Sequence, residues 1–448
     1  MIKIIKKPLQ NIGIDGAIAF TLLSRIVQAG GGLVSIVFIA KFLSANEQGY
    51  YYTFASILAI QVFFELGLSG IITQYAAHEF SHLKWKDGEL LGKDYYKSRL
   101  ASLLRFCVKW FGIVSILLFF LLVGVGFCFF LSYNKGSGIE WQRPWILLCL
   151  ATSLNLFIDP VLAFMDGIGE IKDMSKVRLI QKSVNVILLF IFFSAGFKLY
   201  SAALASTVSI IVNYVQMIFS SRKDKLKIIW GQQGEWVVNY VKEIFPYQWR
   251  IAMSWISGFF IFQLFNPVLF ATDGAVVAGQ MGMTLQVLNG ISALSMSWIN
   301  TKVPIMSSLI AQKEYKKLDT LFNKTLYNLA GANLVFIAVF LILLICCKFF
   351  NLPVANRFIP LFPLLILCVV TFVNQFVFSW ATYLRCHKQE PFLQNSIVSA
   401  ILCSLSTVFL GKYFGLMGIV SGYTTICIAV GLCWGYNIFK TKKLQWHQ

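Results

Sequence analysis

The sequence predicts an all-α polytopic membrane protein, with twelve transmembrane helices in two pseudo-symmetric six-helix bundles. Of its 448 residues, 58% are hydrophobic, and its mean hydropathy is +0.72. Soluble domains are only about 45–50% apolar. Apolar runs of about 20 residues, long enough to cross a bilayer, recur along the whole chain. Basic residues alternate between the connecting loops, and the two halves of the chain resemble each other weakly.

The apolar runs set the bounds of the spans, because each must cover the hydrocarbon core of the bilayer. We expect them at residues 17–42, 50–76, 103–131, 144–165, 179–197, 200–220, 246–270, 275–300, 326–347, 358–383, 392–411 and 415–438.

The formal net charge of +19 follows the membrane topology. Lys3, Lys6 and Lys7 precede the first span, which indicates a cytoplasmic N-terminus. With that orientation most of the 38 Lys and Arg residues fall in inner loops, and the C-terminus is cytoplasmic too. A basic collar of this kind faces anionic lipid heads, so we expect the bilayer as a partner and no nucleic acid.

An internal repeat sets the domain boundaries. Residues 46–58 align with 276–288, which pairs Gly49 with Gly279. The repeat divides the chain into an N-terminal six-helix lobe (1–221), a cytoplasmic amphipathic linker (222–245) and a C-terminal six-helix lobe (246–448). In the linker we expect one apolar face along the inner leaflet, made by Trp236, Val237, Tyr240, Val241, Ile244 and Phe245. Duplicated bundles are a transporter plan, with the substrate held between the repeats.

Three stretches resemble a known superfamily. Residues 42–79 contain an acidic-x-Gly-Tyr turn followed by a long helix with a Gly-rich half. Residues 166–181 form a Gly-x-Gly link, and residues 303–325 contain a proline and then a short charged link that ends in a Leu-Phe pair. Their order and spacing are similar to those of Wzx-type polysaccharide (O-antigen or capsule) flippases of the MATE/MOP transporter superfamily.

The resemblance implies a function without bond chemistry. A flippase of this type moves an undecaprenyl-diphosphate-linked oligosaccharide from the inner to the outer leaflet of the bacterial inner membrane by alternating access. It implies no cofactor beyond a proton or sodium gradient. It implies a monomer that works beside polysaccharide polymerase and glycosyltransferases.

Polar residues inside the spans are the candidate site residues, because charges in hydrocarbon usually face a cavity or a partner. Arg25 and Gln28 share a face of the first span, and Gln61 and Glu65 share one on the second. Arg25 and Glu65 differ in depth by about 3 Å, so they either form a structural ion pair or face the substrate.

Further candidates lie on later spans. They are Asp159, Arg250, Asn289 and Gln375. A position near the membrane interface is the alternative explanation for the first two, and helix–helix hydrogen bonding is the alternative for the last two. We expect Arg25 and Arg250 to bind the diphosphate, since guanidinium groups match phosphate oxygens. Gln28, Gln61, Asn289 and Gln375 complete the predicted substrate-binding set, and Glu65 and Asp159 are candidates for ion coupling.

Two alternatives compete with a flippase. A MATE-type exporter of drugs or cations would have the same fold and repeat. An intramembrane zinc metalloprotease is suggested by the sequence HEFSH, which gives His78, Glu79 and His82, with Asp166 as a third ligand. The zinc alternative is disfavoured because no span continues beyond the motif and the repeat has no place in it. We therefore expect no metal.

Overall fold

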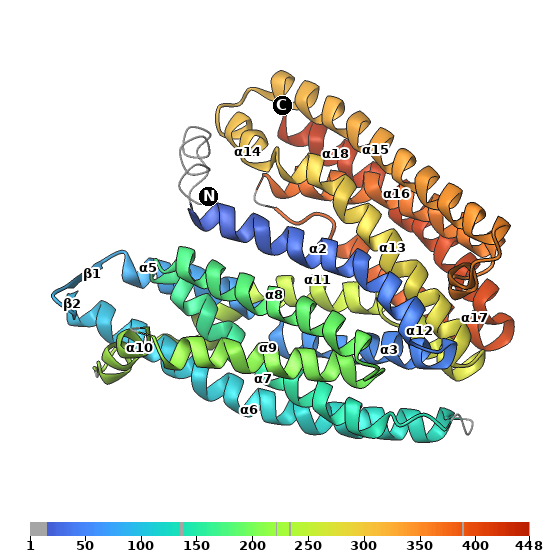
Figure 1. Ribbon diagram of the computed structural model, residues 1–448. Helices are drawn as coiled ribbons and strands as arrows, with labels where there is room; N and C mark the ends of the chain where they lie inside the picture. The colour runs from blue at the N-terminus through green and yellow to red at the C-terminus, as the bar shows by residue number, and fades with distance from the viewer. Residues whose placement is uncertain (1–15, 135–137, 221, 233, 388, 448) are drawn as a thin grey trace, which may run out of the picture. The chain divides into compact units, whose positions relative to one another are not determined.

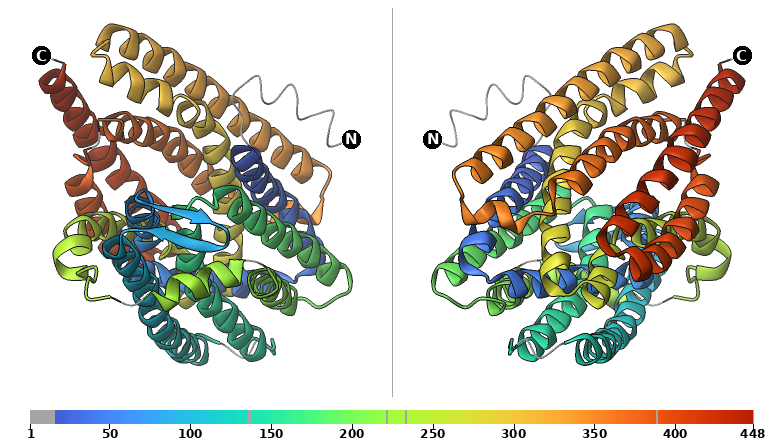
Figure 2. Two further views of the ribbon diagram at one scale, coloured as in Figure 1. Left: turned by 90° about the vertical axis from the view of Figure 1, so that its left-hand side faces the viewer. Right: turned by 90° about the vertical axis from the view of Figure 1, so that its right-hand side faces the viewer.

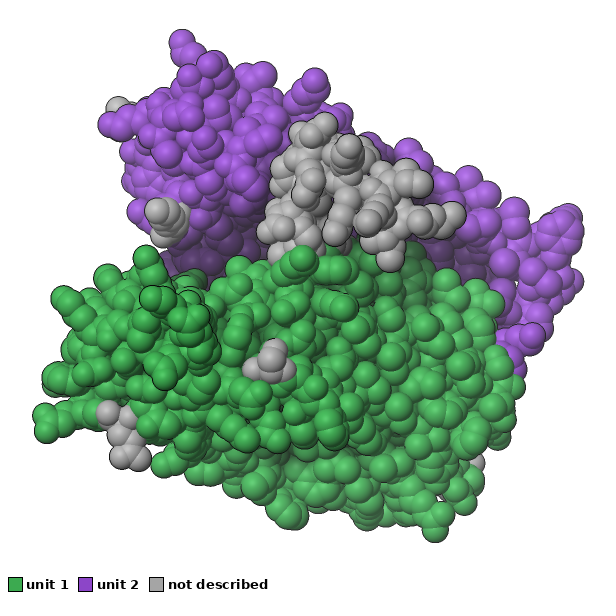
Figure 3. Space-filling model, turned by 60° about the vertical axis from the view of Figure 1, so that its left-hand side comes forward, with its two compact units in different colours: residues 1–38, 60–252 green, residues 39–59, 253–448 purple. Residues whose placement is uncertain are grey.

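The computed structural model describes residues 16–134, 138–220, 222–232, 234–387 and 389–447 (Figure 1). Lys3, Lys6 and Lys7, which belong to the basic residues predicted on the inner side, lie outside the described residues. The chain forms two compact units, residues 1–38 with 60–252 and residues 39–59 with 253–448 (Figure 3). The predicted lobe boundary at 222–245 stays a prediction.

Unit 1 is a bundle of long helices with one short hairpin. It contains most of α2 (Gly16–Phe42), then α4 (Val62–Glu65), α5 (Leu68–Phe80), β1 (Leu83–Lys86), β2 (Glu89–Gly92), α6 (Asp94–Tyr133), α7 (Gln142–Gly167), α8 (Ile171–Ser194), α9 (Tyr200–Ile218), α10 (Arg222–Gly231), the π-helical turn Tyr240–Ile244 and the start of α11 (Phe245–Phe262). The antiparallel strands β1 and β2 stand out in Figure 2.

The helix α7 is the centre of unit 1, because α5, α6 and α9 all pack against it. The helix α2 lies along α8. A β-carbon at Gly31 would come within 2.7 Å of the Val186 side chain, and the rings of Phe38 and Phe190 stack at 4.4 Å. The glycine run 30–32 is therefore a close-packing point in a continuous helix.

Unit 2 is built around α13 (Ala275–Asn300), which packs against α3, α12, α15 and α16. Its elements are α3 (Ala45–Leu58), α12 (Phe265–Thr272), α13, α14 (Val303–Ala311), α15 (Tyr315–Phe349), the 3-10 turn Pro353–Arg357, α16 (Leu361–Arg385), α17 (Leu393–Ile426), the π-helical run Cys427–Trp434 and α18 (Gly435–Trp446), together with the rest of α11.

The described residues hold the twelve predicted spans. Ten helices are long and apolar enough to cross a membrane. One of them, Leu393–Trp446, reverses direction at Gly415, whose φ of 54° only glycine adopts readily, and thus contains two spans. The helix α13 is the twelfth, with the bounds 275–300 that the sequence predicts. The fold class is therefore confirmed, and the chain is a multi-pass membrane protein.

The predicted amphipathic face of the linker is not formed. Residues 234–239 are not helical, so the six apolar side chains do not share one helical face. This segment follows α6 instead: the Ser98 hydroxyl donates to the Trp236 carbonyl at 2.7 Å, and the Val238 amide donates to the Ser102 hydroxyl at 3.2 Å. Hydrogen bonds to α6 thus replace the bonds that a helix would have made.

Two glycines that the repeat aligns with each other are in contact in unit 2. A β-carbon at Gly49 would lie 2.0 Å from the Ala275 carbonyl oxygen, and one at Gly279 would lie 2.8 Å from the Gly49 amide nitrogen. The backbones of α3 and α13 therefore approach more closely than any other residue type allows.

We expect Gly49→Ala to destabilise unit 2 by about 1–3 kcal/mol, because backbone atoms must move to admit the methyl group. The matched control is Gly70→Ala on α5, where nothing lies within 4 Å. This change should be neutral or stabilise by up to about 1 kcal/mol. Thermal unfolding of the purified chain measures both, and equal effects of the two substitutions would contradict the close approach.

Candidate functional site

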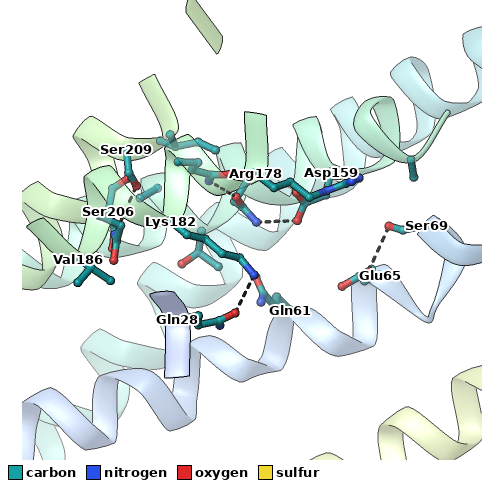
Figure 4. Close-up of a pocket in the computed structure, with 17 residues that line it drawn as sticks. Gln28, Gln61, Glu65, Ser69, Asp159, Arg178, Lys182, Val186, Ser206 and Ser209 are labelled. Carbon is teal, nitrogen blue, oxygen red and sulfur yellow. Dashed lines mark hydrogen bonds between the residues drawn. The ribbon is translucent and has the colours of Figure 1, made fainter. Parts of the chain in front are cut away.

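Unit 1 contains a polar cavity of about 530 Å³ among membrane-spanning helices (Figure 4). Most of the side chains that line it carry a hydrogen-bonding or charged group. The lining comprises Gln28, Gln61, Glu65, Ser69, Ala151, Thr152, Asn155, Asp159, Ala163, Arg178, Gln181, Lys182, Asn185, Val186, Ser206, Ser209 and Ile210. Polar groups at this density need water or a ligand within the membrane.

A broken helix forms one wall of the cavity. The second span is interrupted between α3 and α5, where Leu66 and Gly67 both adopt the left-handed conformation with φ of 49° and 69°. Gln61 and Glu65 line the cavity at this break. The Glu65 carboxylate accepts a hydrogen bond from the Ser69 hydroxyl at 3.2 Å. Irregular backbone is tolerated at membrane depth where it lines a water-filled cavity.

The opposite wall is a chain of hydrogen bonds across α7, α8 and α9. Asn213 donates to the Gln181 side-chain oxygen at 3.0 Å, and Gln181 donates to Asn155 at 3.0 Å. Asn155 in turn donates to the Asp159 carboxylate at 2.6 Å. Each amide donates to the next acceptor, so the network fixes the position of the carboxylate at its end.

Two cations project from α8 into the same space. The Arg178 guanidinium forms an ion pair with Asp166 at 2.7 Å. The Lys182 ammonium donates to the Gln28 side-chain oxygen at 2.7 Å. Within the part of the chain that the structure describes, Lys182 makes no ion pair, so its charge is not neutralised by a direct carboxylate contact.

The structure brings together four of the eight predicted site residues: Gln28, Gln61, Glu65 and Asp159. They come from the first, second and fourth predicted spans, and folding places them around one cavity. Whether they bind substrate or ions stays a prediction.

The two predicted arginines lie elsewhere. Arg25 is exposed and does not line the cavity, and no ion pair joins it to Glu65 among the described residues. Glu65 is engaged by Ser69, one turn further along its own span. Arg250 is exposed, with its guanidinium 5.4 Å from the centre of the Trp249 ring.

Asn289 and Gln375 belong to unit 2. Asn289 lines a second, smaller cavity there. Gln375 is fully buried and donates to the Thr371 carbonyl at 3.3 Å, one turn back on α16.

Sequence reasoning did not single out Arg178 and Lys182. The predicted span began at residue 179, which left Arg178 outside it and put Lys182 in its first turn, whereas α8 begins at Ile171. The signal was present in their spacing. Residues 178, 181, 182 and 185 follow the i, i+3, i+4, i+7 pattern of one helical face, and all are polar.

The sequence HEFSH is part of an ion-pair cluster. Glu79 is 2% exposed and accepts from Arg99 at 2.9 Å, and Arg99 also pairs with Glu243 at 2.5 Å. His78 is exposed, and His82 stacks on Tyr96 with ring centres 4.0 Å apart.

Asp166, the fourth residue of the zinc hypothesis, forms an ion pair with Arg178 instead. No three His, Cys, Asp or Glu side chains among the described residues are placed to hold a metal ion. The donor set that the zinc hypothesis needs is thus not assembled.

No protein-family model matches the chain, and no curated protein matches it in sequence. Its fold, however, is that of solved membrane transporters. An inward-facing multidrug resistance MATE family transporter of the MOP superfamily superposes with a TM-score of 0.63 at 16% identity, over 93% of this chain and 99% of the other.

Two further structures share the fold. The MATE multidrug transporter DinF-BH, solved in complex with a ligand, has a TM-score of 0.63 at 13% identity, over 95% of this chain and 94% of that one. A MOP superfamily transporter from Pyrococcus furiosus, described as having a binding pocket of reverse polarity that suggests a different function, has a TM-score of 0.52 at 15% identity, over 96% of this chain and 97% of that one. The chain therefore has the fold of MATE transporters of the MOP superfamily.

We expect Glu79→Ala to destabilise unit 1 by about 2 kcal/mol, because Arg99 loses the buried one of its two carboxylate partners. His78→Ala, which changes the exposed neighbour of Glu79, is the control. It should leave the melting temperature and the metal content of the protein unchanged. Stoichiometric zinc in the purified protein that is lost in His78→Ala would contradict this assignment.

The Arg99 side chain also lowers the pKa of Glu243 below its ordinary value of 4.5, chiefly through its hydrogen bonds to that carboxylate. A lowered carboxyl pKa contributes stability that is complete above pH 4.5 and is lost as the pH falls through the folded-state value. The melting temperature of Glu243→Gln should therefore lie below that of the parent by a constant amount above pH 4.5, and the gap should narrow at lower pH. A gap that stays constant on further acidification would show that the Glu243 charge is not involved.

Proposed function

We propose that the chain is a secondary transporter that moves an undecaprenyl-diphosphate-linked oligosaccharide from the inner to the outer leaflet by alternating access. The observation that carries the proposal is the pair Arg178 and Lys182, one helical turn apart on α8 and both facing a polar cavity between membrane spans. An anionic group inside the membrane needs such partners.

The chemistry of the pair suits a diphosphate. A guanidinium offers a planar fork to two phosphate oxygens, and an ammonium adds a compact charge with three donors. Gln28, the hydrogen-bond partner of Lys182, is neutral, so a phosphate can replace it without leaving a carboxylate unpaired. Arg25 and Arg250 stay candidates for contacts with the substrate on its path to this cavity.

Glu65 and Asp159 supply a means of coupling. Both carboxylates face the cavity that holds the two cations. Protons or sodium ions bound there would make the cavity more positive and so strengthen diphosphate binding, and by linkage the diphosphate would strengthen ion binding by the same factor. This reciprocity would couple the two movements, so that the bound ions travel in the same direction as the lipid.

A MATE-type exporter of cationic drugs is the second candidate. Glu65 and Asp159 favour it, because two carboxylates in one cavity also suit an organic cation. The ligand-bound MATE multidrug transporter shares this fold. Lys182 weighs against a cation, because it repels one at close range within the same cavity.

The cellular setting follows from the proposal. A substrate on undecaprenyl diphosphate places the chain in a bacterial inner membrane, with both termini cytoplasmic. Glycosyltransferases would supply the glycan and a polymerase would consume it.

We expect Arg178→Ala and Lys182→Ala each to slow transport about tenfold or more, since each removes a charge-assisted bond to the diphosphate. The assay uses proteoliposomes containing undecaprenyl-diphosphate-linked N-acetylglucosamine, with movement between leaflets followed by lectin capture. Lys176→Ala, on an exposed face of the same helix, is the control and should match the parent.

Parent protein that moves this lipid no faster than empty liposomes would contradict the proposal. Gradient-driven efflux of the organic cation tetraphenylphosphonium in place of lipid movement would instead establish the exporter. Full activity in both Arg178→Ala and Lys182→Ala would be consistent with the proposed function but would show that these two residues are not its binding site.

A further inference from the structure

Unit 2 has a cavity of its own, of about 290 Å³, with a different chemistry from that of unit 1. Among the described residues, no Asp, Glu, Lys, Arg or His lines it. Aromatic rings and uncharged polar groups share its wall, the rings being those of Phe262, Phe265, Phe378 and Tyr423. A charged ligand would find no counter-ion in this wall, and a ligand without polar atoms would leave the polar groups unsatisfied.

A second broken helix borders this cavity. The seventh span is interrupted between α11 and α12, at Gln263 and Leu264. Pro267 explains the break, because it has no N–H to donate to the Gln263 carbonyl one turn earlier. Gln263 lines the cavity at the interruption, as Gln61 does in unit 1. Interrupted membrane helices are where transporters of this general plan hold their ligands.

Three polar side chains in the wall are available to a ligand. Among the described residues, the side chains of Gln263, Asn289 and Ser292 have no protein hydrogen-bond partner. Together they offer two amides and one hydroxyl, each of which both donates and accepts. By contrast, Asn374 donates to the Tyr423 hydroxyl at 3.1 Å, which fixes that ring in place.

The aromatic groups are fixed in orientation. The rings of Phe265 and Tyr423 meet edge to face, with centres 5.0 Å apart and planes at 68°. Phe262 and Phe378 form a second such pair at 6.5 Å. Rigid ring faces beside amides that donate and accept suit a ligand with apolar C–H faces and a rim of hydroxyl groups.

We propose that this cavity is a binding site for one uncharged sugar ring. The lack of charge in its described lining favours a neutral hexose or N-acetylhexosamine over a uronic acid or an organic cation. Its volume lies just below the range of about 300–1,000 Å³ usual for ligand sites, which suits a single ring better than a whole oligosaccharide.

The site deepens the proposed function and rests on it in one respect: the ring would be part of the transported glycan. Binding itself needs neither the diphosphate nor the lipid. A free monosaccharide is therefore a sufficient probe.

The test is saturation-transfer difference NMR on the full chain in a detergent without a sugar head group. The probes are glucose, galactose and N-acetylglucosamine, with glucuronate and tetraphenylphosphonium as charged comparators. We expect a saturation-transfer signal from at least one neutral sugar. Asn289→Ala and Gln263→Ala should each reduce that signal about fivefold or more, since each removes hydrogen bonds to the ring.

Two control variants should retain the signal. Asn300→Ala changes an exposed asparagine on the same helix α13, and Lys182→Ala changes the cavity of unit 1. Tyr423→Phe is a further test variant for the case that an alanine variant does not fold. It keeps the ring and removes only the hydroxyl that accepts from Asn374, and it should reduce the signal.

The proposal is overturned if no neutral sugar gives a signal above that of empty micelles, or if the cation or glucuronate binds in its place. It is also overturned if Asn289→Ala, Gln263→Ala and Tyr423→Phe all bind like the parent. Sugar binding that follows these predictions in a chain that fails the liposome assay would count against the lipid substrate and leave this site standing.

Discussion

Hydrocarbon offers no hydrogen-bond partner, and the side chains of α7, α8 and α9 are arranged around that constraint. Asn213, Gln181 and Asn155 donate in sequence until the chain of bonds reaches Asp159. Every member lies inside a span, so each would cost several kcal/mol if it faced lipid. These three hydrogen bonds hold the helices in register and keep a carboxylate at the edge of a cavity.

Both cavities border an interrupted helix, and this shared feature links fold to function. A continuous helix satisfies its own backbone and presents only side chains, whereas a broken one leaves polar backbone groups at membrane depth. The interruption near Gln61 and Glu65 also falls where the chain passes from unit 2 into unit 1, between residues 59 and 60. A ligand that contacts this stretch therefore acts on a segment that joins the two compact units.

Hydropathy and periodicity predict the helices well, because the bilayer sets span length directly. The bounds of α2 and α13 follow from apolar length alone. The sequence-based site assignment is less complete. Arg25 and Glu65 have matching depths, but pairing also depends on how each helix is rotated about its axis, and α2 is rotated so that Gly31 meets Val186. The start of α8 was predicted eight residues too late, which left Arg178 outside the span, because a polar face lowers the hydropathy of a helix end.

Short motifs were the weakest guide. HEFSH has the spacing of a zinc site, yet Glu79 pairs with Arg99, which lies 20 residues further along the chain. The linker has the periodicity of an amphipathic helix, yet its backbone bonds to Ser98 and Ser102 of α6. In both cases a tertiary partner that local spacing does not reveal decided the structure.

The central claim is that an anionic lipid head group binds at Arg178 and Lys182. An experimental structure of the full chain with undecaprenyl diphosphate, which carries the head group without any sugar, tests it most directly. We predict density for the two phosphates within hydrogen-bonding distance of both side chains, with Gln28 displaced from Lys182. Phosphate density bound elsewhere, with the Lys182–Gln28 contact intact, would contradict the claim.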